Sequence, residues 1–128
     1  MTKEEKQLLL RDICCRLPYN TVVLTTGCGT TRKMKLDHQV YSWAEQDTFR
    51  IMPYLFPMSS MTDAQREEYE SLCIKETTEC ADLSGFFFTK DNYYDTVESF
   101  DWLNKNHFDY RGLIEEGLAI DAPGKNIY

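Results

Sequence analysis

The sequence has no long apolar run, and its first residues are charged rather than hydrophobic. No stretch approaches the roughly 18–20 consecutive apolar residues that a membrane-spanning helix needs. Residues 1–7, MTKEEKQ, do not resemble a secretory signal, because no apolar core or small-residue cleavage site follows them. We therefore expect a cytoplasmic protein whose five cysteines stay reduced, since the cytosol does not maintain structural disulfides.

Patterns that bind a metal ion or a nucleotide phosphate are also missing. Structural zinc sites use close cysteine or histidine pairs about two to four residues apart. In this chain Cys14 and Cys15 are adjacent, and Cys73 and Cys80 are seven positions apart. The glycines of Gly27–Gly29 lie between two strand-like runs and are not followed by the Gly-Lys-Ser/Thr of a phosphate-binding loop. We predict no metal, no cofactor and no catalytic residue.

Basic residues are scarce in the second half of the chain. Residues 1–60 carry 8 Lys and Arg against 6 Asp and Glu, whereas residues 61–128 carry 6 against 15. The second half should repel a phosphate backbone, which argues against direct nucleic-acid binding. The same acidity suits a basic protein partner. If the carboxylates of residues 63–82 lined one exposed ridge, they would form an acidic decoy for nucleic-acid-binding proteins.

Glycine- and serine-rich linkers and internal repeats are absent too, and the length of 128 residues fits one domain of about 100–150 residues. We predict a single domain over residues 1–128. Thr2 and Glu5 have the spacing of a capping box, and apolar residues then recur at helical spacing until Pro18. A helix over residues 3–16 follows from this pattern, because proline cannot donate the next backbone hydrogen bond.

Residues 20–52 are typical of a small antiparallel sheet. A β-branched run, the turn at Gly27–Gly29 and a second run predict a hairpin over residues 20–36. Further strands are expected at residues 39–43 and 48–52. These elements would form a β-meander of three to four strands. Two prolines make residues 53–57 an aromatic connector rather than a central strand.

The remainder of the chain is predicted to be mostly helical. Thr62 and Gln65 match a second capping box, followed by a helix over residues 66–76, and Phe86–Phe88 suggests a short buried strand. One helical face is expected from Val97 to His107, and a last short helix from the spacing of three apolar residues, Leu113, Ile114 and Leu118. The predicted fold class is therefore α+β, with a small antiparallel sheet between an N-terminal helix and a C-terminal helical section.

The densest group of functional side chains lies in the segment FDWLNKNHFDYRGLIEEGLAI, residues 100–120. It could form an acid–base or anion-binding cluster, with an aromatic stacking platform beside it; the residues are Trp102, His107, Asp109, Tyr110 and Arg111. A structural interpretation is equally complete. Asp109 would be the N-cap of a helix beginning near Tyr110, and His107, at the end of a helix, would be favoured when protonated.

Two long motifs, IMPYLFPMSSMTDAQREEY (residues 51–69) and FDWLNKNHFDYRGLIEEGLAIDAPGKNIY (residues 100–128), resemble an uncharacterised family of short proteins from Bacteroides-group gut bacteria and their phages and mobile elements. The likeness covers nearly the whole chain, and the middle of the chain departs most from the family pattern. It implies no activity, cofactor or catalytic residue. The resemblance implies a small protein that is associated with phages or mobile elements and acts on host or defence machinery.

The function expected from the sequence is that of a non-enzymatic binding or adaptor protein with a protein partner. The expected binding surface combines the connector 53–57 with the C-terminal group, through Tyr54, Phe56, Trp102, His107, Asp109, Tyr110 and Arg111. The alternative is a small enzyme or a nucleotide- or small-ligand-binding protein that uses His107, Asp109, Tyr110 and Arg111. These two hypotheses differ in geometry, since an enzyme should bring at least three of these side chains into one concave pocket.

Overall fold

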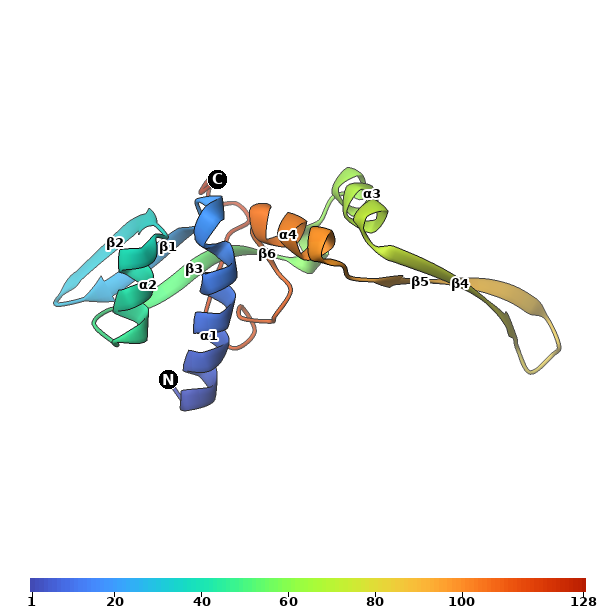
Figure 1. The fold of residues 1–128 in the computed structure, drawn as a ribbon, viewed down its shortest axis with the longest axis horizontal. Helices are drawn as coiled ribbons and strands as arrows, with labels where there is room; N and C mark the ends of the chain where they lie inside the picture. Colours follow the sequence, from blue (N-terminus) through green and yellow to red (C-terminus); the bar gives the residue numbers. More distant parts are fainter. The chain divides into compact units, whose positions relative to one another are not determined.

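The computed structural model describes all residues, 1–128, and its fold is α+β, as predicted (Figure 1). The chain divides into two compact units, which are described separately here. Unit 1 comprises Met1–Ser60 and Leu103–Tyr128, and unit 2 comprises Met61–Trp102. The prediction that the whole chain is one domain stays a prediction. No helix is both long and apolar enough to cross a membrane.

Four α-helices and seven strands make up the two units. The helices are α1 (Lys3–Arg16), α2 (His38–Glu45), α3 (Asp63–Leu72) and α4 (Val97–Lys105). The strands of unit 1 are β1 (Val22–Gly27), β2 (Thr30–Lys35), β3 (Arg50–Pro57), β6 (Phe108–Asp109) and β7 (Ile120–Asp121). Unit 2 holds β4 (Ile74–Ala81) and β5 (Phe87–Tyr94). The strand count therefore exceeds the three to four that the sequence predicted.

Unit 1 is built on a sheet in which β3 is the central strand, with the order β2-β1-β3-β6 and with β7 also paired to β3. The first part of β3 runs antiparallel to β1 over Arg50–Pro53, and its second part runs parallel to β7 and then β6. The predicted meander is thus correct for β1, β2 and the start of β3. It misses the parallel pairing that brings the C-terminal segment into the sheet.

The core of unit 1 lies between this sheet and the helices α1 and α2, which both lie on one face of it (Figure 1). Its fully or nearly fully buried side chains come from helices, strands and the C-terminal segment: Leu9, Ile13, Val23, Leu36, Val40, Ala44, Ile51, Leu55, Leu113, Leu118 and Ala119. Helix α1 has the predicted bounds. The Thr2 hydroxyl accepts from the amide of Glu5, and Pro18 directs the chain into a 3-10 turn, Leu17–Tyr19.

Two sequence predictions for residues 39–57 are wrong. Residues 39–43 belong to helix α2 and not to a strand, because the Asp37 carboxylate caps the helix by accepting from the amide of Val40. Residues 53–57 form the second half of β3 and not a connector. Both prolines, Pro53 and Pro57, fall on the last pair of a ladder, where a missing donor disrupts little pairing.

The C-terminal segment of unit 1 contains turns where a last short helix was expected. Residues 110–119 form turns and bends and contain no helix, and Gly112 and Gly117 adopt φ values of +78° and +73°. Left-handed residues at these two positions interrupt a right-handed helix. The spacing of Leu113, Ile114 and Leu118 therefore results from a compact loop and not from a helix. Leu113 and Leu118 are buried because this loop contributes them to the core.

Unit 2 consists of α3, the β4–β5 hairpin and the start of α4. Both hydrogen bonds of the capping box at Thr62 and Gln65 are present, since each side chain accepts from the backbone amide of the other residue. Helix α3 ends at Leu72 rather than at residue 76. Asp95 accepts hydrogen bonds from the hydroxyls of Tyr69 and Ser99, which ties α3 to the start of α4. The prediction of a short buried strand at Phe86–Phe88 is correct in part. Phe87 and Phe88 begin β5, but the three residues are 71%, 79% and 49% exposed and not buried.

The turn between β1 and β2 offers a test of local strain. Cys28 and Gly29 have φ values of +51° and +77°, as a two-residue type I′ turn requires. Replacing Cys28 by Asn should stabilise unit 1 by about 0.5–1 kcal/mol, because asparagine tolerates this conformation better. The measurement is the midpoint of thermal or urea unfolding. Gly29→Ala should have the opposite sign, and an unchanged midpoint for both variants would contradict this assignment.

Candidate functional site

The seven residues predicted to form a binding surface come from both units and differ in burial. Tyr54 and Phe56 lie on β3, and the four residues from His107 to Arg111 lie at and around β6, all in unit 1. Trp102 belongs to unit 2 and to helix α4, where its ring centroid is 5.8 Å from that of Tyr69. Tyr54, Trp102 and Asp109 are buried.

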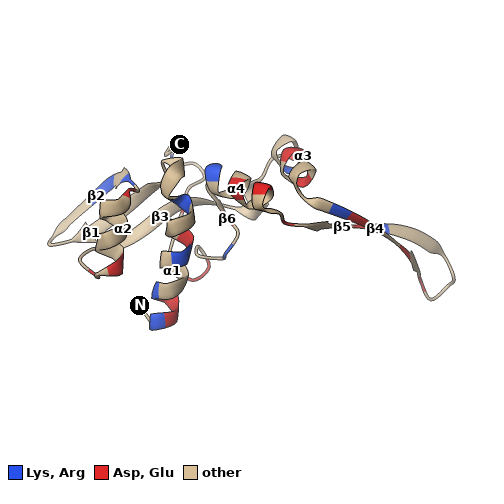
Figure 2. Cartoon of the chain, in the orientation of Figure 1, with Lys and Arg blue, Asp and Glu red and all other residues tan.

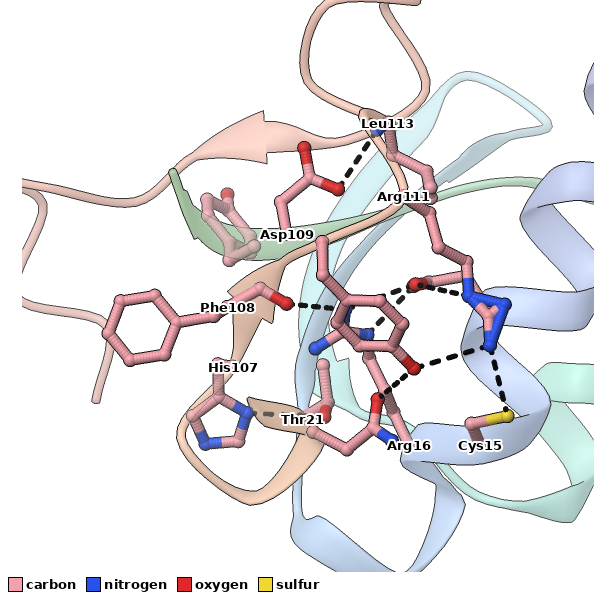
Figure 3. Close-up of polar contacts among 12 residues, drawn as sticks. Cys15, Arg16, Thr21, His107, Phe108, Asp109, Arg111 and Leu113 are labelled. Carbon is pink, nitrogen blue, oxygen red and sulfur yellow. Dashed lines mark hydrogen bonds and ion pairs between the residues drawn. The ribbon is translucent and has the colours of Figure 1, made fainter. Parts of the chain in front are cut away.

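A buried ion pair on α1 organises the group in unit 1 (Figure 3). Asp12 and Arg16, one helical turn apart, have side chains with no exposed surface. Nε and one terminal nitrogen of Arg16 donate to the two carboxylate oxygens of Asp12 at 2.8 and 3.0 Å. The same terminal nitrogen donates to the carbonyl oxygen of Phe108 at 2.7 Å. Arg16 therefore joins α1 to β6, a connection that sequence reasoning missed.

Arg111 and Tyr110 extend this network. The Arg111 guanidinium lies 3.7 Å from an oxygen of Asp12 and over the ring of Tyr110, 4.9 Å from its centroid. The Tyr110 hydroxyl donates to the side chain of Asn104 at 3.0 Å and accepts from Arg111 at 3.2 Å. Burial raises the pKa of Tyr110, so its phenol stays protonated at neutral pH and can donate to Asn104.

His107 is a neutral residue packed in unit 1. Its backbone is left-handed, with φ of +64°, and its ring stacks on Tyr128 with a centroid distance of 3.7 Å. The Thr21 hydroxyl lies 3.3 Å from Nδ1 (Figure 3). Burial, with a smaller contribution from the Arg16 charge, lowers the pKa of His107 to about 4. The expectation of a protonated histidine at a helix end is wrong, because α4 already ends at Lys105.

Asp109 caps the compact loop that follows β6. Its two carboxylate oxygens accept from the amides of Leu113 and Ile114, each at 2.9 Å (Figure 3 draws the bond to Leu113). The predicted capping role is therefore present, although it stabilises a turn and not a helix. With both oxygens occupied by backbone donors, Asp109 is held as a structural carboxylate.

Tyr54 and Phe56 contact the end of the chain. The Tyr128 hydroxyl donates to the carbonyl oxygen of Tyr54 at 2.7 Å and accepts from the amide of Val22 at 3.0 Å. The Phe56 ring packs against Phe108 and Tyr128, with centroid distances of 6.1 and 5.7 Å. Tyr128 therefore occupies a central place in this cluster, and sequence reasoning gave it no role.

One cavity in unit 1 is lined by residues outside this network. It measures about 510 Å³ and is lined by residues of α1, α2, β3 and the C-terminal loop: Met1, Glu5, Leu9, Ala44, Asp47, Phe49, Arg50, Ile51, Glu116, Gly117 and Leu118. Two smaller cavities border unit 2 residues only. None of these three cavities is lined by His107, Asp109, Tyr110 or Arg111. No group of three or more potential ligands could hold a metal ion.

The most exposed apolar side chains lie on unit 2. Leu83 and the three phenylalanines Phe86–Phe88 surround the turn of the β4–β5 hairpin, and the Asp82 carboxylate holds that turn by accepting from the amides of Ser84 and Phe86. Sequence periodicity missed this surface, because a run of three phenylalanines normally indicates a core strand.

Comparisons of the chain with protein-family models, with curated proteins and with solved structures found no match. The candidate site is therefore defined by geometry alone.

The buried ion pair predicts a large coupling energy. Arg16→Met should cost about 3–5 kcal/mol of unfolding free energy, because it leaves the Asp12 carboxylate buried without its main partner. The double variant Asp12→Leu with Arg16→Met should be more stable than Arg16→Met alone. Lys6→Met is the control, since the Lys6–Asp47 pair has the same 2.8 Å distance but is exposed. Additive effects in urea unfolding would contradict the coupling.

His107 predicts a specific pH dependence. Its pKa is about 4 in the folded state and 6.5 in the reference state, so the unfolded chain binds the proton first. The stabilisation is complete above pH 6.5 and is lost as the pH falls towards 4. His107→Asn, which keeps a residue that tolerates positive φ, should flatten the melting temperature over this range. His38→Asn, at the exposed second histidine, should follow the wild type. Parallel curves for all three proteins would refute the assignment.

Proposed function

We propose that this chain is a non-enzymatic binding protein of the cytoplasm, which acts through a basic protein partner docked on the β4–β5 hairpin of unit 2. The observation that carries this proposal is that acidic charge and exposed apolar side chains are concentrated together in unit 2. The network in unit 1 supports it indirectly, because its side chains are engaged in holding the fold.

The charge of the molecule is divided unequally between the units. Unit 2 carries 3 Lys and Arg against 11 Asp and Glu, a net charge of −8. Subtracting these from the 14 basic and 21 acidic residues of the chain leaves 11 against 10 in unit 1, a net charge of +1. Figure 2 shows acidic residues on α3, α4 and the hairpin. Such a surface raises the association rate of a basic partner and repels acidic ones.

The hairpin turn supplies the apolar part of the surface. Leu83, Phe86 and Phe87 are each more than two-thirds exposed. Exposed apolar patches with a polar rim mark protein interaction sites, and aromatic residues supply much of the binding energy in such sites. Residues 74–94 contain 2 lysines and 4 carboxylates, so the fitting partner is an apolar groove with basic side chains at its rim.

A second candidate function is that of a nucleic-acid decoy. Six carboxylates between residues 63 and 82 belong to exposed residues, namely Asp63, Glu67, Glu68, Glu76, Glu79 and Asp82. In this case the basic partner would be a nucleic-acid-binding protein, and duplex DNA would compete with the chain. The resemblance to proteins of Bacteroides-group bacteria and their phages adds a setting for either function, namely a small protein directed at host or defence machinery.

The test begins with capture from extracts of a Bacteroides-group bacterium, followed by purification of the captured protein and calorimetric titration. The double variant Phe86→Ser and Phe87→Ser should weaken binding at least about tenfold, because it removes the exposed aromatic anchors. Binding should also weaken as salt increases. Tyr94→Ser, at the opposite end of β5, is the matched control. Equal affinity for the wild type and the Phe86/Phe87 variant would refute the proposal, and competition by duplex DNA would favour the decoy.

A further inference from the structure

The β4–β5 hairpin is a two-stranded sheet with no third strand. Its strands pair along eight positions, from Ile74 opposite Tyr94 to Ala81 opposite Phe87, and none of their residues is buried. An isolated two-stranded ribbon is marginally stable in water, and stability normally needs a third strand or a packed face. Unpaired edge strands also present a row of free amides and carbonyls to any complementary strand.

The hydrogen bonds of the turn show which backbone groups of β4 point outward. The amide of Asp82 donates to the carbonyl oxygen of Phe86 at 3.0 Å, so this pair belongs to the hydrogen-bonded class. Hydrogen-bonded and non-hydrogen-bonded pairs alternate along an antiparallel ladder. The even-numbered residues of β4 therefore direct their backbone amides and carbonyls towards β5. The outward-facing amides and carbonyls are therefore those of Lys75, Thr77, Glu79 and Ala81.

We propose that the free edge of β4 binds the β4 edge of a second copy of this chain, antiparallel and about a two-fold axis at Thr77. The two hairpins then form one four-stranded sheet. This interface goes beyond the proposed function and does not depend on it, because it uses the strand edge and not the aromatic turn.

The register follows from charge complementarity. A two-fold axis perpendicular to the sheet keeps each residue and its copy on the same face, and directly opposed residues also share a face. Since side chains alternate between the two faces along a strand, two opposed residues must both have even numbers or both have odd numbers. With Thr77 opposite its copy, Lys75 lies opposite Glu79 of the second copy, and this ion pair occurs twice. Ile74 then lies opposite Cys80. Opposite charges and apolar pairs at such positions each stabilise a sheet by about 0.2–1 kcal/mol.

The neighbouring registers are less favourable. An axis at Glu76 places two carboxylates opposite each other, and an axis at Thr78 places Lys75 opposite Ala81, without an ion pair. The outer edge of β5 fits worse, because its two central registers place Lys90 opposite Lys90 or Asp91 opposite Asp91. Among these central registers, the Thr77 axis on β4 pairs opposite charges and opposes no like ones.

The net charge of −8 on each unit 2 opposes association at long range. At 0.15 M salt the screening length is about 8 Å, so carboxylates farther from the edge contribute little repulsion. The opposed lysines and glutamates are much closer than this distance, since facing residues of adjacent strands lie about 4.5–5.5 Å apart. The test is therefore made at this salt concentration.

The first experiment is sedimentation equilibrium on the full chain with a charge swap. The wild type should dimerise reversibly, and Lys75→Glu should weaken dimerisation by roughly tenfold or more, because two attractive pairs become repulsive. Adding Glu79→Lys to that variant should restore it. Lys90→Glu on β5 controls for the change in net charge, and Asp91→Asn controls for the loss of the ion pair that Lys75 forms with Asp91 within the hairpin, at 3.5 Å. A monomeric wild type, or a double variant as weak as Lys75→Glu, would overturn the proposal; circular dichroism verifies that each variant folds.

The second experiment tests the register directly. Ile74→Cys is combined with serine at the other cysteines except Cys80, and the protein is oxidised with diamide. Positions 74 and 80 are about 20 Å apart along one strand, so a disulfide between them must join two chains. Mass spectrometry should find a 74–80 link. Links of 74–74 or 80–80 alone, or no link, would overturn the Thr77 register.

Discussion

The buried pair Asp12–Arg16 is the constraint on which the C-terminal part of unit 1 depends. Arg16 satisfies the Asp12 carboxylate and the Phe108 carbonyl at the same time, so it fixes β6 against α1. Burying two charges costs several kcal/mol per ion unless the geometry and further hydrogen bonds compensate. The bidentate contact and the carbonyl bond supply part of that compensation, because the second terminal nitrogen of Arg16 is buried without a hydrogen-bond partner. The positions of His107, Tyr110 and Arg111 then follow, because each lies within three residues of Phe108.

This network engages side chains of types that are also common in active sites. An acid–base site needs titratable groups poised near neutral pH and open to a substrate. Here burial lowers the pKa of His107 and raises that of Tyr110, both away from neutrality. Asp109 is occupied by two amides. The same residue types therefore help to close the core of unit 1.

Local signals predicted much of the fold. The capping threonines, Pro18 and the Gly29 turn are decided by neighbouring residues, and they placed α1, the start of α3 and the β1–β2 hairpin. The errors come from long-range effects. The buried residues Leu36 and Val40 are four positions apart, and this spacing fits both a helix and a strand, so it does not identify α2. The parallel pairs of β3 depend on residues more than fifty positions away in the sequence. The sequence shows that residues 102–111 are rich in functional side chains, but it shows Asp12 and Arg16 only as members of a helix, because their contact with Phe108 is long-range.

Unit 1 is discontinuous, since residues 61–102 are inserted between Ser60 and Leu103. During synthesis, α1, α2 and the first three strands emerge before this insertion, whereas β6 and β7 emerge after it. The second half of β3 therefore stays unpaired until residues 103–121 have been synthesised. Unit 2 has mostly local contacts and can form its hairpin on the ribosome in the meantime. A premature stop after residue 102 would leave Arg16 without the Phe108 carbonyl and β3 with an open edge, a species prone to aggregate rather than a smaller folded protein.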